Sequence, residues 1–146
     1  MKIYLGAGGS PRDGWINIDN RALTGIDIVR DVLRGLPFAD GTIEEIASDN
    51  FLEHIPQEEV IWFMNEMWRV LQDNGRSHHR IALAGTANFY QDPTHLSHWI
   101  PMGLEYFTKD HYKNLYYNGD IKPWVIEKCD IISNGHGMET VMIKSC

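Results

Sequence analysis

Closely spaced glycines follow the first apolar run of this 146-residue chain, and an aspartate ends the second. Residues 3–8 read Ile-Tyr-Leu-Gly-Ala-Gly, and residues 15–19 read Trp-Ile-Asn-Ile-Asp. Glycines after a buried strand carry no Cβ, so a ligand can approach the backbone closely. A carboxylate at the end of the next strand can accept both hydroxyls of a ribose. Together Gly6, Gly8 and Asp19 predict a site for a ligand that contains a nucleoside. The Gly-x-Gly-Gly motif is weak by itself, and it also fits a tight turn after an edge strand.

Three further side chains could supply acid–base chemistry. Asp49 follows an apolar run, His54 precedes an Ile-Pro pair, and His95 stands in an Asp-Pro-Thr-His segment. A base whose pKa lies near the working pH can take a proton from a hydroxyl or an amine. Each residue also has a plainer interpretation. Asp49 fits a solvent-facing loop carboxylate, His54 fits a cap or a packing residue, and His95 fits a local turn.

A metal site is an alternative interpretation of the same region. Asp92, His95 and His98 offer three potential ligands within seven residues, and His111 lies downstream. Zinc sites use closely spaced histidines together with a carboxylate. This pattern would make the chain a metal-dependent hydrolase. However, His-x-x-His is common by chance, so the principal hypothesis assigns no metal ligands.

Apolar runs separated by turn residues predict short strands that would position these side chains. The expected strands cover residues 2–5, 15–19, 27–29, 45–48 and 80–84. Before the last of them, apolar residues at helical spacing predict a helix from Pro56 to Leu71, stopped by Asn74-Gly75. Strands that alternate with a helix indicate an α/β fold with a largely parallel sheet.

The C-terminal third has a different pattern. Helical segments are expected over 101–107 and 109–118, followed by strands over 124–132 and 138–144. Ser-Asn-Gly-His-Gly separates these two strands, which is typical of a hairpin. The sheet should therefore have an antiparallel edge. We expect residues 1–146 to form a single domain.

The connection between the first two strands is unusually short. Only six residues lie between Gly8 and Trp15, whereas a parallel crossover normally contains a helix. Six extended residues span about 20 Å at roughly 3.3 Å each, which suffices to return along a strand of about 16 Å. We therefore predict a parallel pair joined by a bare loop, with the first crossover helix missing.

Composition narrows the range of partners. The formal net charge is −7 and no Lys/Arg run occurs, which argues against an extended nucleic-acid surface. No segment resembles a membrane span or a signal peptide, so we expect no membrane partner and a cytoplasmic location. Cys129 and Cys146 provide neither a disulfide framework nor metal spacing. A thinly covered sheet face or the C-terminal hairpin could support a homodimer.

Several segments in sequence order carry a family resemblance. They are Leu5–Gly8, Gly14–Asp19, Asp31 ahead of Leu36–Gly41, Glu45–Ser48, Leu52–Ile55 and Arg69–Leu71. With this order the chain resembles the small class I S-adenosylmethionine-dependent methyltransferases, in a compact branch with a shortened first crossover. Gln91–His95 followed by Trp99 is similar to a box of bacterial and phage-type members of that branch. The resemblance covers roughly residues 2–108, and it depends on the order of the motifs because none of them is specific alone.

The resemblance implies a Rossmann-like fold, S-adenosylmethionine as cofactor, and methyl transfer to an unidentified small-molecule or glycan-like acceptor. The implied cofactor contacts are Gly6, Ala7 and Gly8 at the methionine part, Asp19 at the ribose, Asp31 and Val32 at the adenine, and Asp49, Asn50 and Phe51 at the methyl-donor end. The candidate bases are Asp49, His54 and His95. Tyr4 stands where the family often carries an acid or Asn. A module that binds S-adenosylmethionine without turnover is therefore a further alternative.

Overall fold

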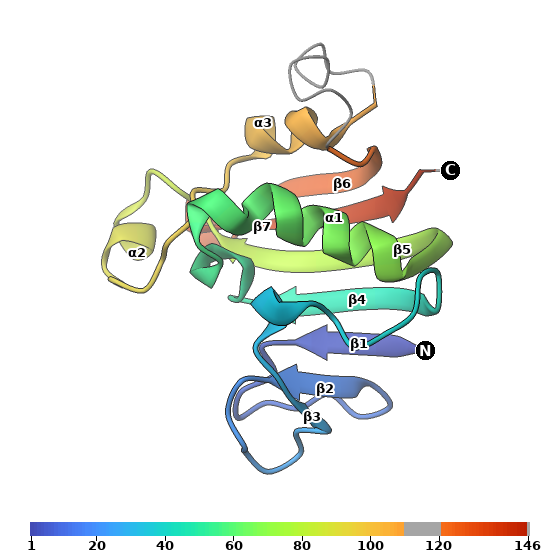
Figure 1. The fold of residues 1–146 in the computed structure, drawn as a ribbon. Coiled ribbons are helices and arrows are strands. Elements are labelled where there is room, and N and C mark those ends of the chain that lie inside the picture. Colours follow the sequence, from blue (N-terminus) through green and yellow to red (C-terminus); the bar gives the residue numbers. More distant parts are fainter. Residues whose placement is uncertain (110–120, 146) are drawn as a thin grey trace.

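A computed structural model describes residues 1–109 and 121–145 as one mixed β-sheet with few helices (Figure 1). Within these residues the strand order is β3-β2-β1-β4-β5-β7-β6. The strands are β1 (Lys2–Leu5), β2 (Ile16–Asp19), β3 (Ile28–Val29), β4 (Ile43–Asp49), β5 (Leu71–Ala82), β6 (Trp124–Ile132) and β7 (Gly137–Lys144). The first five strands pair in parallel, and β7 is antiparallel to both β5 and β6. The predicted α/β fold with an antiparallel C-terminal hairpin is confirmed.

The β1 and β2 strands are parallel neighbours that are joined without a helix. Ile3 pairs with Ile16, and the connecting residues 6–15 contain no helical segment. The buried Asn17 side chain holds this loop, because it accepts a hydrogen bond from the Arg12 N–H (2.7 Å) and donates to the Arg12 carbonyl (3.1 Å). The predicted absence of the first crossover helix is therefore confirmed.

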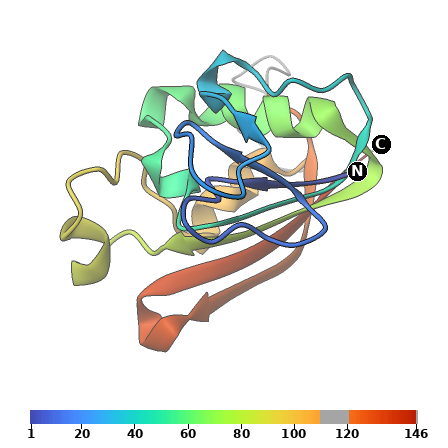
Figure 2. The ribbon, with the colours of Figure 1, turned by 90° about the horizontal axis from the view of Figure 1, so that it is seen from below.

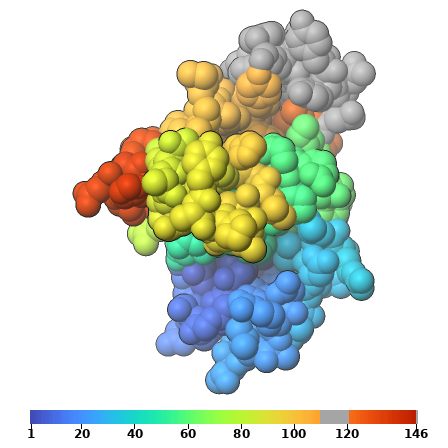
Figure 3. All heavy atoms as spheres, turned by 90° about the vertical axis from the view of Figure 1, so that its left-hand side faces the viewer, coloured from blue at the N-terminus to red at the C-terminus, as the bar shows by residue number. Residues whose placement is uncertain are grey.

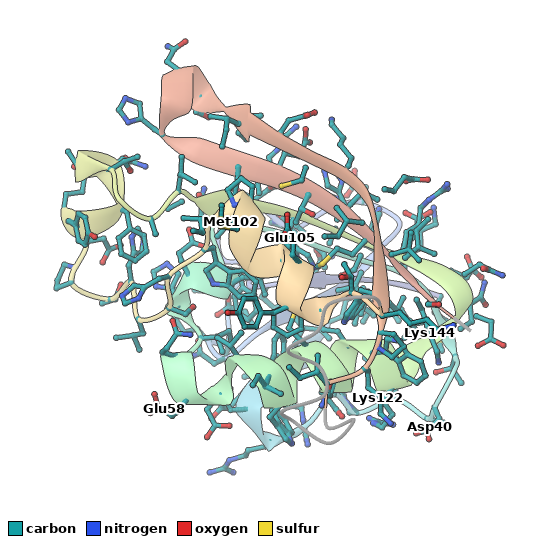
Figure 4. All side chains as sticks on the ribbon, turned by 90° about the horizontal axis from the view of Figure 1, so that it is seen from above. Asp40, Glu58, Met102, Glu105, Lys122 and Lys144 are labelled. Atoms are coloured by element: carbon teal, nitrogen blue, oxygen red, sulfur yellow. The ribbon has the colours of Figure 1, made fainter. Side chains whose placement is uncertain are left out.

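The helix α1 (Val60–Val70) packs on one face of the sheet and buries Phe63, Met64 and Met67 against it. The remaining helical segments are short: η1 (Val32–Arg34), η2 (Leu52–His54), η3 (Gln57–Glu59), α2 (Ala87–Tyr90), α3 (Pro101–Leu104), η4 (Glu105–Phe107) and η6 (Ser133–Gly135). Figure 2 shows α1 on one side of the sheet. In Figure 4, Met102 and Glu105 mark α3 and η4, which lie on that same side.

The end of α1 corrects the sequence prediction. We expected a helix through Leu71 with Asn74-Gly75 as its stop, but α1 ends at Val70 and β5 begins at Leu71. Leu71 has an extended backbone (φ −65°, ψ 138°) and pairs with Ile43. Asn74, with φ +62°, lies inside β5 where the register against β4 shifts. The apolar Leu71 fits both a helix end and a buried strand start, so periodicity could not separate the two.

Other element boundaries agree more closely. Residues 101–107 are helical, as predicted, and the two hairpin strands are present. The strand expected over 80–84 is the end of the much longer β5, and β4 is also longer than the 45–48 predicted for it. Beyond residue 109, the predicted helical segment over 109–118 lies outside the described residues.

The two faces of the sheet differ in character. Ile3, Leu5 and Ile46 belong to the core under α1, whereas Tyr4 and Ala47 form a separate small cluster on the opposite face. We call this opposite side the open face, because no helix of the described residues covers it (Figure 2). Ion pairs cross it, among them Lys2–Glu45 (2.9 Å) and Lys128–Glu139 (2.7 Å). Within the described part of the chain, no helix has the length and apolarity needed to span a bilayer.

Candidate functional site

A cavity of about 580 Å³ lies at the carboxyl ends of β1, β2 and β4. Ligands of open α/β sheets bind at this edge, and the volume lies within the range of about 300–1,000 Å³ for small-molecule sites. Figure 3 faces the edge and shows the segment near residues 85–99 (yellow) beside the N-terminal part of the chain (blue). The predicted site residues that line the cavity are Gly6, Asp19, Asp31, Val32, Asn50, Phe51 and His54.

Asp19 connects the glycine turn to the end of β2. Its buried carboxylate accepts hydrogen bonds from the Gly8 N–H (2.9 Å), the Arg21 N–H (3.0 Å) and the Arg21 Nε (3.1 Å). Burial by itself raises the pKa of Asp19, but the hydrogen bonds from Arg21 and Gly8 outweigh it, so the pKa lies below its usual value. The carboxylate is therefore charged at neutral pH and available as an acceptor in the cavity.

Gly6 is crowded by the protein itself. Its φ is +62°, and a Cβ at this position would overlap Cδ2 of Phe51. The Phe51 ring thus packs directly on the Gly6 backbone, which no larger residue would permit. At Gly8, by contrast, a Cβ would first meet the Arg21 guanidinium at 3.5 Å. The close approach at Gly6 therefore positions an apolar wall of the cavity.

Another wall of the cavity is formed by η1. Asp31 caps η1 by accepting a hydrogen bond from the Leu33 N–H (3.0 Å), and Val32 is buried in the core. The residues after η1 are tied to α1, because the Leu36 N–H donates to Glu66 (2.7 Å). This bond holds the η1 wall against the rest of the domain.

Asp49 does not line the cavity. Its carboxylate accepts a hydrogen bond from the Tyr4 hydroxyl (2.9 Å) and lies 3.4 Å from Arg12 on the open face. Successive side chains of a strand point to opposite faces. Ser48 therefore faces α1, and Asp49 turns away from it. Ala7 is also buried in the open-face cluster with Tyr4, so neither Asp49 nor Ala7 is brought together with the other predicted site residues.

The segment that contains His95 is docked onto η2, which follows β4. The Glu53 carbonyl accepts hydrogen bonds from the Leu96 N–H (2.7 Å) and the Ser97 N–H (3.0 Å). The buried Trp99 donates its indole N–H to the Leu52 carbonyl (3.3 Å). These bonds bring two segments that are 40 residues apart to the border of the cavity.

This docking assembles Glu53, His54 and His95. Their potential metal-ligating atoms lie within 4.8 Å of one another, and the two imidazole rings are 5.0 Å apart. Of the alternative ligand set Asp92, His95 and His98, the first two are adjacent (3.4 Å), whereas His98 is not in this cluster and contacts Phe89. The third histidine of that hypothesis, at position 111, lies outside the described residues.

Glu53 was missed by the sequence analysis. It is fully buried, and burial raises its pKa although the Ala82 N–H, His54 and His95 act in the opposite direction. The available signal was an acidic residue within the apolar run Leu-Glu-His-Ile. An acidic residue within an apolar run indicates a functional site only once the segment that buries it is known.

Comparison with known proteins identifies the fold. No family model matches the chain, and no curated protein matches its sequence. A SAM-dependent methyltransferase from Archaeoglobus fulgidus superposes with a TM-score of 0.67 at 16% identity, over 98% of this chain and 85% of that one. The Burkholderia thailandensis 1,6-didemethyltoxoflavin-N1-methyltransferase, solved with 1,6-didemethyltoxoflavin and S-adenosylhomocysteine, gives a TM-score of 0.69 at 11% identity over 99% and 71%. The [4+2]-cyclase SpnF gives 0.65 at 13% over 99% and 74%.

The chain therefore has the fold of the SAM-dependent methyltransferases, as the resemblance implied. The compact phage-type branch stays a prediction. Because identities are low and a cyclase shares the fold, the similarity does not fix the reaction. The reaction has to be argued from the site.

Proposed function

We propose that the chain binds S-adenosylmethionine in the cavity and transfers its methyl group to a small-molecule acceptor. The observation that carries this proposal is the hydrogen bond between the Gly8 N–H and Asp19 (2.9 Å), which joins the glycine turn and the buried carboxylate at one cavity. The solved methyltransferases with this fold, one of them with S-adenosylhomocysteine bound, support the choice of cofactor.

Asp19 has limited room for the ribose. A carboxylate offers about four acceptor positions, and three protein N–H groups already occupy three of them. The Arg21 side chain is 65% exposed, so its Nε can leave Asp19 and regain hydration. This displacement would free a second position, and both ribose hydroxyls could then donate to Asp19.

The remaining walls suit the other parts of the ligand. Val32 and Leu33 offer apolar surface for the adenine, and Phe51 and Ile55 shield the methyl-donor end from water. Bound S-adenosylmethionine supplies an electrophilic methyl group, which a nucleophile takes by in-line displacement. The chain's main task is to hold the acceptor in line with that methyl group. We assign the acceptor side of the cavity to His54 and Thr94, which line it.

Calorimetric titration with S-adenosylhomocysteine tests this proposal. Asp19→Asn keeps the side-chain shape but removes the charge, and we expect its affinity to fall about tenfold or more. Asp27→Asn is the matched control, because Asp27 accepts a hydrogen bond from the Asn17 N–H (2.7 Å) and does not line the cavity. It should bind like the parent protein.

Two results would contradict the proposal. Equal affinities of the parent protein and Asp19→Asn would show that Asp19 does not contact the ligand. If the parent protein is folded by circular dichroism and does not bind S-adenosylhomocysteine, the proposed cofactor is wrong.

A further inference from the structure

Glu53, His54 and His95, which we call the Glu-His-His cluster, contain a buried oxygen that no residue in the described part of the chain hydrogen-bonds. Glu53 is 0% exposed, and its Oε1 accepts a hydrogen bond from the Ala82 N–H (3.2 Å). Its Oε2 is buried and has no hydrogen-bond partner among the described residues. Buried carboxylate oxygens are normally satisfied, so this atom points to a ligand that the protein atoms do not provide.

The protonation of His54 follows from its neighbours. Its Nδ1 lies 2.9 Å from the Thr94 carbonyl and 3.2 Å from the Thr94 hydroxyl oxygen. That hydroxyl donates its own proton to Asp92 (2.6 Å). Both Thr94 oxygens can therefore only accept from His54, so Nδ1 carries the proton. In the neutral ring the lone pair is left on Nε2.

His95 is held in the same tautomer. Its Nδ1 lies 2.7 Å from the Phe89 carbonyl, which can only accept. In the neutral ring of His95 the lone pair is therefore left on Nε2, which lies 3.4 Å from Oδ2 of Asp92. Metal-binding histidines nearly always donate their other ring N–H to a carbonyl or carboxylate, which fixes the ring for coordination. Both histidines of the cluster meet this condition.

We propose that the Glu-His-His cluster binds a divalent transition-metal ion, with zinc as the best match. Two imidazole nitrogens and one carboxylate are a known zinc ligand set that leaves a further position open. Magnesium and calcium prefer oxygen ligands throughout. Zinc bonds of about 2.0–2.2 Å place neighbouring ligand atoms about 3.5 Å apart. One potential ligand atom on each of the three residues lies within 4.8 Å of the others, so metal binding would draw the side chains closer together.

The ion would lie at the border of the cavity, because His54 belongs to both. One lone pair cannot both bind a metal and accept a proton, so this proposal replaces the base role that the sequence suggested for His54. Metal binding itself does not depend on the proposed methyl transfer. Only the ion's place on the acceptor side rests on the proposed function.

Metal titration of the full chain tests the inference. After treatment with EDTA, we expect one Zn²⁺ site by calorimetry and the visible absorption bands of a bound ion with Co²⁺. His95→Ala and Glu53→Gln should each weaken Zn²⁺ binding more than about 100-fold, because loss of a supporting residue alone costs 10–100-fold. Glu53→Gln can keep the hydrogen bond from Ala82. His98→Ala, an exposed histidine outside the cluster, should change affinity less than about twofold.

Three outcomes would overturn the inference: no Zn²⁺ binding by the parent protein, unchanged binding in the cluster variants, or an equal loss in His98→Ala. Titration of the same samples with S-adenosylhomocysteine separates the two proposals. Zinc binding that survives in Asp19→Asn, while S-adenosylhomocysteine binding falls, supports both. Normal S-adenosylhomocysteine binding without zinc binding overturns only the metal site.

Discussion

The two faces of the sheet accommodate buried polar groups by different means. On the α1 face, His79 is fully buried and hydrogen-bonded through both ring nitrogens, to Ser48 (2.6 Å) and Ser77 (2.5 Å). Burial lowers the pKa of His79 to about 3, so the ring is neutral. On the open face, Glu139 is charged, and hydrogen bonds led by that from Lys128 (2.7 Å) lower its pKa to about 2.

Two neighbouring polar residues at the end of β4 illustrate this difference. Ser48 and Asp49 are neighbours at the end of β4, yet they face opposite sides of the sheet. The cavity opens toward the α1 face, where Ile18 and Val32 of the core contribute to it. Asp49 is therefore held by Tyr4 and Arg12 on the open face and does not line the cavity.

The largest predicted effect is at the contact between β1 and Phe51 on the α1 face. Gly6→Ala should lower the free energy of unfolding by about 2–4 kcal/mol, because it combines a strained φ with a clash against the Phe51 ring. Gly41→Ala is the control. Gly41 has φ +68° and no atom within 4 Å of the added Cβ, so only about 1–2 kcal/mol should be lost. Equal losses in urea denaturation would show that Phe51 does not crowd Gly6.

The next effect concerns the neutral His79. An unfolded histidine takes up a proton near pH 6.5, whereas the folded pKa is about 3. The contribution of His79 to stability is therefore present above pH 6.5 and lost as the pH falls toward 3. At pH 7.5 we expect His79→Gln to be about 1–2 kcal/mol less stable than the parent protein. This gap should narrow between pH 6.5 and 5 in urea denaturation, and a constant gap would contradict a neutral buried His79.

Glu139 on the open face should respond in a different pH window. Its folded pKa of about 2 lies below the ordinary value of 4.5, so its contribution is present above pH 4.5 and lost as the pH falls toward 2. We expect Glu139→Gln to cost about 1 kcal/mol at pH 7, and this cost should be lost as the pH falls from 4.5 toward 2. A decline that coincides with that of His79→Gln would mean that the two faces do not differ as described.

The smallest effect is expected for Asp49→Asn. Asp49 hydrogen-bonds Tyr4 on the open face and does not line the cavity. Its substitution should change S-adenosylhomocysteine affinity less than about twofold by calorimetry. A loss of affinity as large as that of Asp19→Asn would show that Asp49 belongs to the site.

Local patterns explain which features could be predicted from the sequence. The bare β1–β2 loop followed from chain length between Gly8 and Trp15, and the hairpin followed from its turn residues. The face of Asp49 depends on strand register, where a shift of one residue reverses every side chain. Composition does not determine the strand register.

A contact between segments far apart in the sequence explains why the sequence analysis missed Glu53. Glu53 becomes a candidate ligand only because the segment 91–99 folds back onto η2 and brings His95 beside it. No spacing within Leu-Glu-His-Ile indicates a partner 40 residues away. The sequence therefore shows the residues of the Glu-His-His cluster, but it does not show that they lie together.

The central claim is that a nucleoside-containing cofactor occupies the cavity at the ends of β1, β2 and β4. An NMR titration of the ¹⁵N-labelled protein with S-adenosylhomocysteine tests it most directly. We predict amide shift changes concentrated at Gly8, Asp19, Val32 and Phe51, with none at Glu139 on the open face. Saturating ligand that leaves these four amides unchanged, or shifts that concentrate on the open face, would contradict the account.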